Sequence, residues 1–160
     1  MLTFAGTAVA ASSGGMGVPV TPVPGDKAKL NKDGTATPPE NAPRKVVEAI
    51  EAANEIEDKP YEYGGGHGDF KDKGYDCSGA VSYALHAAGT LKSPLDSSGL
   101  MKWGDRGKGE WITVYSNPGH AYVVIAGLRF DTSMTKGNGP GWSKEMRPGK
   151  GFKKRHWDGL

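Results

Sequence analysis

The sequence predicts an α+β domain, in which helices come first and a small antiparallel sheet follows. Two segments before residue 90 carry apolar residues at helical spacing, and three segments between residues 110 and 133 are rich in β-branched and aromatic residues. Helical segments followed by a run of strands are typical of this class, because consecutive strands pair most simply in antiparallel fashion.

The first predicted helix covers residues 43–59, with Asn41 as its candidate cap. Its apolar stripe, at spacings of three and four, consists of Val46, Val47, Ile50 and Ala53. The second predicted helix covers residues 77–88 and ends at Gly89, a residue type that commonly follows a helix. Its apolar residues recur at similar spacings, so each helix should bury one face.

Three strands are predicted after the helices, over residues 110–116, 120–127 and 128–133. A tight turn near Gly127 should join the second strand to the third, so that the two lie side by side. A short helix that starts at Ser97 or Ser98 is expected before the strands.

Residues 12–43 are rich in Ser, Gly, Pro and Thr and show no periodicity, which is typical of a flexible linker. The small apolar residues at the start resemble the later part of an export signal, although no Lys or Arg precedes Lys27. An atypical or truncated signal, a piece of a longer chain and a disordered terminus all fit this segment. We therefore expect a disordered or signal-like N-terminus and linker (residues 1–41) and a folded domain with a basic C-terminal extension (residues 42–160).

Charge, hydropathy and cysteine content exclude several classes of protein. The net charge of +2 is too small to indicate nucleic-acid binding by itself. No stretch approaches the roughly 18 apolar residues that a membrane-spanning helix needs. A single cysteine excludes an intramolecular disulfide and a Cys-rich zinc site.

Cys77, the only cysteine, stands at the first turn of the second predicted helix. Unpaired backbone N–H groups and the helix dipole favour a thiolate at this position. The same N–H groups can stabilise an oxyanion on an acyl substrate. The position therefore suits acyl-transfer chemistry, and the alternative interpretation is a small, buried, apolar cysteine.

A thiol nucleophile needs a base, and His120 is the best placed of the four histidines. It opens an apolar strand, where a polar side chain can face a cleft. If the chain reverses near Gly127, Asp131 lies on the neighbouring strand and can hold the imidazole in the required tautomer. A zinc site formed by Cys77, His120 and His67 has no recognisable ligand spacing.

The segments PYEYGGG and GYDCSGAVSYALHAAG, followed by GHAYVVIAGLRFDTS, resemble the NlpC/P60 cysteine peptidases of bacterial cell walls over residues 42–135. The resemblance implies a reduced papain-like fold, in which the helix bearing the cysteine packs on a small antiparallel sheet. It implies that Cys77 is the nucleophile and His120 the general base. Asp131 falls near the family's third polar residue, which is usually His, Asn or Gln.

The resemblance also implies substrate-binding residues. Tyr61 resembles the family tyrosine whose hydroxyl lies beside the thiol. Asp76 and Ser78 resemble residues that bind the free amine of the stem peptide, and their alternative role is helix capping. The segment before His120 lacks the Gly-Asp-Leu element common in the family, which indicates a different cleft wall.

The function expected from the resemblance is hydrolysis of amide bonds in peptidoglycan stem peptides by a secreted or cell-wall-associated monomer, without cofactor or metal. A related thiol amidase or acyltransferase, and a catalytically silent cell-wall-binding module, are the alternatives. The basic segment after Ser133 could hold anionic wall polymers. It could instead be a solvated tail, or it could pack on the domain through Trp142, Phe152 and Trp157.

Overall fold

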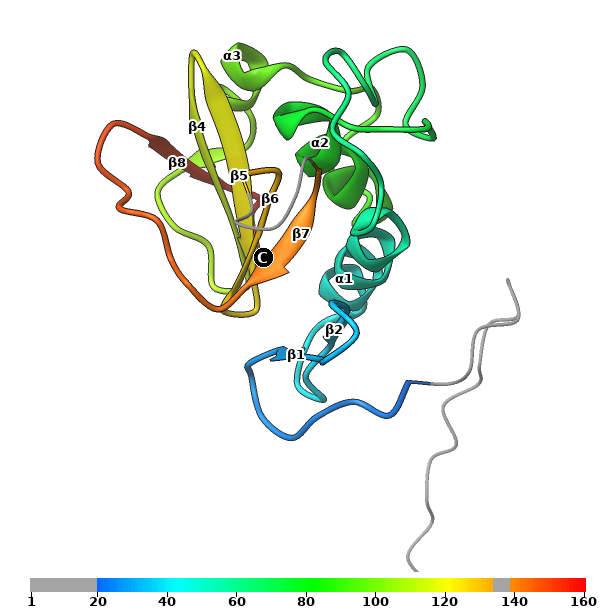
Figure 1. The fold of residues 1–160 in the computed structure, drawn as a ribbon. Coiled ribbons are helices and arrows are strands. Elements are labelled where there is room, and N and C mark those ends of the chain that lie inside the picture. The colour runs from blue at the N-terminus through cyan, green and yellow to red at the C-terminus, as the bar shows by residue number, and fades with distance from the viewer. Residues whose placement is uncertain (1–19, 134–138) are drawn as a thin grey trace, which may run out of the picture.

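The computed structural model describes residues 20–133 and 139–160. Helices α1 (Arg44–Ile56) and α2 (Cys77–Ala87) lie on one side of an antiparallel sheet (Figure 1). In the described residues this sheet has six strands in the order β3-β8-β4-β5-β6-β7. Their bounds are β3 Asp105–Arg106, β4 Ile112–Asn117, β5 His120–Ile125, β6 Leu128–Asp131, β7 Gly141–Ser143 and β8 Lys153–His156. The predicted α+β class, with helices packed on an antiparallel sheet, is confirmed.

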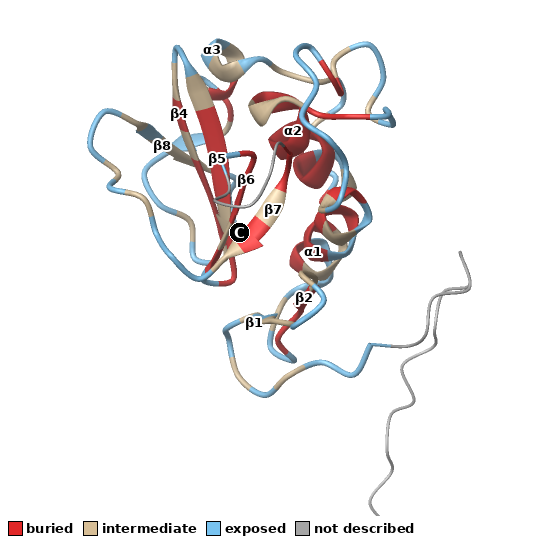
Figure 2. Ribbon diagram, in the orientation of Figure 1, coloured by how far each residue is buried: buried red, intermediate tan, exposed pale blue. Residues whose placement is uncertain are grey.

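The helix α2 packs between α1 and β5. Figure 2 shows both α2 and β5 largely in the colour of buried residues. The core under the helix includes Val81 and Leu85 of α2 and Val123 and Ile125 of β5, each at most 1% exposed. This packing fixes the first turn of α2 against the start of β5.

Two tight turns set the register of the central strands. Asn117 pairs with His120 across the β4–β5 hairpin, and the Asn117 side chain accepts the His120 backbone N–H at 2.8 Å. The β5–β6 hairpin turns at Ala126 and Gly127, whose φ angles of 46° and 85° are the left-handed values that a two-residue hairpin favours. The predicted turn therefore exists, and β6 runs antiparallel beside β5.

Part of the predicted linker has a packed structure. Strands β1 (Lys29–Leu30) and β2 (Ala36–Thr37) form a hairpin, and Ala36 is 1% exposed. The Asn54 side chain of α1 accepts from the Ala36 N–H and donates to its carbonyl, both at 2.8 Å. The composition of residues 12–43 predicts a flexible linker. It does not reveal the hydrogen bonds to Asn54, because that residue belongs to a helix distant in the sequence. The signal-like residues 1–19 lie outside the described residues.

Helix ends differ from the prediction only in detail. Pro43, rather than Asn41, stands at the N-cap of α1, and the Asn41 side chain instead donates to Asp26. The short helix α3 (Ser97–Leu100) begins where the sequence predicts, with Asp96 as its cap. Within the described residues, none of the helices is both long and apolar enough to cross a bilayer.

The basic C-terminal segment packs on the domain. Strand β8 inserts between β3 and β4. Trp142 of β7 donates its indole N–H to the Asn54 side chain at 2.9 Å, and Trp157 stacks on Trp103. Leu160 is buried. Of the alternatives for this segment, the solvated tail is thereby excluded for residues 139–160.

Candidate active site

Cys77 is the first residue of α2 and is partly buried. Asp76 caps the helix by accepting the Gly79 N–H at 2.7 Å. Burial alone would raise the pKa of the Cys77 thiol, but hydrogen bonds from the His120 side chain and the Ala121 backbone, with the imidazolium charge, outweigh it and lower the pKa. The thiolate is therefore favoured where the sequence predicted it.

His120 lies between the thiol and a carboxylate. Its Nε2 lies 2.9 Å from Asp131 Oδ1, which leaves Nδ1 as the ring nitrogen for Cys77. Burial alone would lower the pKa of His120, but hydrogen bonds to Asp131 and Cys77, together with their charges, raise the pKa to about 9. A raised pKa for His120 and a lowered pKa for Cys77 both favour an imidazolium paired with a thiolate.

Asp131 has a side chain that is 0% exposed, and cationic groups surround it. Arg147 donates to its Oδ2 at 3.1 Å, and Arg129 Nε lies 3.7 Å from the same oxygen. Burial alone would raise the pKa of Asp131, but the hydrogen bond to His120, the Ser133 N–H and the Arg147 contact lower the pKa. The carboxylate therefore stays ionised beside the imidazole.

Arg147 is a site residue that the sequence reasoning missed. It belongs to residues 144–152, which link β7 to β8 and are called here the C-terminal strap. Its guanidinium lies 5.4 Å from the ring centre of Tyr122 and 5.5 Å from that of Phe152. The Phe152 ring also meets the His120 ring edge to face, with centres 6.4 Å apart. The strap thus packs directly against the imidazole and its carboxylate.

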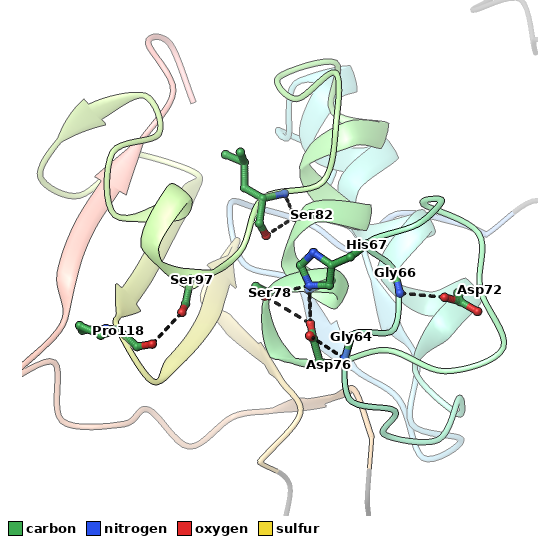
Figure 3. A network of polar contacts seen from close by, with 11 residues as sticks. Gly64, Gly66, His67, Asp72, Asp76, Ser78, Ser82, Ser97 and Pro118 are labelled. Carbon is green, nitrogen blue, oxygen red and sulfur yellow. Dashed lines mark hydrogen bonds and ion pairs between the residues drawn. The ribbon is translucent and has the colours of Figure 1, made fainter.

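A second polar network joins the first turn of α2 to the glycine-rich loop before it (Figure 3). Asp76 Oδ1 lies 2.9 Å from His67 Nε2, and Oδ2 accepts the Gly64 N–H at 3.2 Å. The Ser78 hydroxyl lies 3.1 Å from the same His67 nitrogen. Asp76 therefore both caps α2 and ties down the glycine-rich loop.

His67 is a second residue that the predicted site leaves out, because histidines in loops are mostly solvated. Here the flanking glycines allow the loop to approach α2 closely. A Cβ added at Gly79 would lie 2.0 Å from the carbonyl oxygen of Gly65. A histidine next to a Gly-Gly-Gly run was the signal in the sequence.

Of the predicted site residues, Cys77, His120 and Asp131 come together as one chain of hydrogen bonds. Tyr61 is 43% exposed, and burial, followed by the charges of Cys77 and Asp76, raises the pKa of its hydroxyl. Tyr61 therefore lies within electrostatic range of Cys77 and Asp76. Among residues 20–133 and 139–160, no group of three or more His, Cys, Asp or Glu side chains is arranged to hold a metal ion.

Two solved structures share this architecture. The peptidoglycan hydrolase RipB of Mycobacterium tuberculosis superposes with a TM-score of 0.53 at 21% identity, covering 71% of this chain and 68% of RipB. This chain has the RipB fold. Rv1477, a hypothetical invasion protein of the same organism, superposes with a TM-score of 0.52 at 16% identity, covering 86% of this chain and 95% of Rv1477. No protein-family model matches the chain, and no curated protein matches it.

Proposed function

We propose that this protein is a cysteine peptidase of the NlpC/P60 type that hydrolyses amide bonds in peptidoglycan stem peptides. The observation that carries the proposal is the arrangement of Cys77, His120 and Asp131. The Cys77 thiol lies at the N-terminus of α2, and His120 Nε2 lies 2.9 Å from Asp131 Oδ1. The shared fold with RipB, a peptidoglycan hydrolase, supports the substrate class. Such a substrate places the protein outside the cytoplasm, secreted or associated with the wall.

In the first step the Cys77 thiolate attacks the carbonyl carbon of the amide, and the carbonyl electron pair moves to oxygen. The oxyanion faces the backbone N–H of Cys77, which has no helical partner at the first turn. The Tyr61 hydroxyl is a second donor, because its raised pKa keeps it protonated.

In the second step the C–N bond breaks, and the His120 imidazolium donates its Nδ1 proton to the leaving amine. A thioester remains on Cys77. Water then attacks the thioester while neutral His120 accepts its proton, which releases the acid and restores the thiolate–imidazolium pair. Asp131 holds the ring by its Nε2 throughout and stabilises the cation.

Asp76 and Ser78 are the proposed binding residues for the free amine of the stem peptide. A substrate ammonium at Asp76 would form a charge-assisted hydrogen bond. His67 lies 2.9 Å from Asp76 Oδ1 and would compete with the substrate ammonium for this oxygen. Selectivity for substrates with a free amine should therefore depend on His67 as well as Asp76.

The deciding experiment digests defined muropeptides with the wild type and with the Cys77→Ala and His120→Ala variants, and identifies the products by mass spectrometry. We expect one amide bond to be cut by the wild type and none by either variant. Full turnover by either variant would refute the mechanism. A thioester on Cys77 formed from other amides, with muropeptides intact, would instead identify a thiol amidase or acyltransferase.

A further inference from the structure

A groove of about 340 Å³ opens on the sheet face that is turned away from α2. Alternate residues of a strand point to opposite faces of a sheet. Thr113 and Tyr115 of β4 line the groove, whereas Ile112 and Val114 belong to the hydrophobic core. The C-terminal strap forms one wall and contributes Arg147. The groove therefore lies on the sheet face opposite α2, and Arg147 is shared between the groove and the candidate active site, where it binds Asp131.

The groove is strongly basic. Four cations line it, from Lys27, Lys108, Arg147 and Lys154, and they face one carboxylate, Glu110. Arg147 is engaged by Asp131. The three lysines form ion pairs with none of the carboxylates in residues 20–133 and 139–160. Unpaired lysines around one hollow produce a positive potential that attracts anions.

Aromatic side chains also line the groove. Trp111 and Tyr115 line the groove and are partly exposed. The Tyr115 ring stacks on that of Tyr122, with centres 4.7 Å apart and planes within 4°. Flat aromatic surfaces with a few convergent polar groups are typical of ligand sites. They suit the carbon-bearing face of a sugar or polyol unit.

We propose that this groove binds an anionic polymer of sugar or polyol units, whose phosphate or carboxylate groups meet Lys108 and Lys154 while a repeat unit packs on Trp111 and Tyr115. The proposal goes beyond the hydrolase function, because no step of it uses Cys77. The sequence predicts only that the whole basic segment after Ser133 attracts anionic polymers. The groove is a defined site, because Lys154 of that segment lines it and Lys150 and Lys153 do not.

The test measures binding of the full chain by calorimetry at low and high salt. The probes are poly(glycerol phosphate), polygalacturonate, uncharged dextran and single-stranded RNA. We expect one of the two anionic sugar or polyol polymers to bind, with weaker binding at high salt, and dextran and RNA to bind poorly. Tighter binding of the phosphate polymer or of the carboxylate polymer identifies the charged group. Binding of neither polymer, or equal binding of RNA, overturns the proposal.

The variant Lys108→Glu/Lys154→Glu should weaken polymer binding at least about tenfold. The matched control, Lys150→Glu/Lys153→Glu, makes the same change of charge at two other lysines, one in the strap and one in β8. Neither control lysine lines the groove. Equal losses in both variants would show diffuse attraction and overturn the proposal.

Reductive methylation of the wild-type chain tests the groove without relying on variants that could misfold. Bound polymer should protect Lys108 and Lys154 from reductive methylation and leave Lys153 reactive. Protection of all three, or of none, contradicts the groove. The Cys77→Ala variant should bind the polymer as the wild type does, so a failure of the proposed hydrolysis leaves this test intact.

Discussion

Replacing Asp131 by Asn removes one charge from the centre of the candidate site and keeps the shape of the side chain. The carboxylate is fully buried, lies 2.9 Å from His120 Nε2 and accepts a bond from Arg147 at 3.1 Å. Burial lowers the pKa of His120, and the Asp131 carboxylate is the main group that raises it. The variant removes that charge. We therefore expect the pKa of His120 to fall from about 9 toward or below the ordinary value of 6.5.

The size of the effect follows from that difference in pKa. A change of this size corresponds to about 3 kcal/mol of lost imidazolium stabilisation, at 1.36 kcal/mol for each tenfold change in proton affinity. If all of it is lost from the transition state, kcat/KM near neutral pH should fall by roughly two hundredfold. The cations of Arg147 and Arg129 would also lose their shared carboxylate, so unfolding should become easier by about 3–5 kcal/mol.

The assay is an NMR titration of the His120 ring, combined with chemical denaturation to show that the variant is folded at the pH used. The control is Asp96→Asn, the same substitution at the exposed cap of α3. The control should leave the pKa of His120 unchanged. A His120 pKa that stays near 9 in Asp131→Asn would refute the reasoning, because another group would then be holding the proton.

Three other outcomes are expected. Arg147→Met removes a cation but keeps the carboxylate, so the pKa of His120 should rise, and a fall measured by the same titration would contradict the proposed role of the strap. In the wild type, kcat/KM should decline as the pH rises through about 9, when His120 loses the proton destined for the leaving amine. The rate of Cys77 alkylation by iodoacetamide depends only on the thiolate and should not decline over that pH range. If the alkylation rate and kcat/KM declined together, the proton on His120 would not explain the loss of activity. Gly79→Ala brings a Cβ within 2.0 Å of the Gly65 oxygen and should destabilise the fold by about 1–3 kcal/mol in urea denaturation, whereas Gly68→Ala, with nothing within 4 Å, should not.

The parts of the structure that the sequence predicts are those that local signals specify. The start of α2 depends on Asp76 and Gly79, three residues apart, and the β5–β6 turn depends on Ala126 and Gly127 alone. These two features bring the helix N-terminus and the strand that begins at His120 into the expected relation. The catalytic roles themselves stay predictions until they are measured.

The parts that the sequence does not predict depend on contacts between distant residues. β8 is four residues long and inserts between β3 and β4. The hydrophobic pattern of residues 153–156 does not predict this pairing. Arg147 reaches Asp131 only because the strap crosses the sheet face. The Asn54 side chain likewise accepts hydrogen bonds from the Ala36 backbone and from the Trp142 indole, two residues that are far apart in the sequence. Composition alone made these segments resemble a linker and a tail.

The late position of Arg147 has a consequence for how the molecule is made. Cys77, His120 and Asp131 are all synthesised before the strap. Until the strap emerges, the nascent chain lacks the guanidinium beside Asp131 and the strand that fills the gap between β3 and β4. A chain that ends at Ser133 would therefore carry Cys77, His120 and Asp131 without the Arg147 guanidinium and without β8.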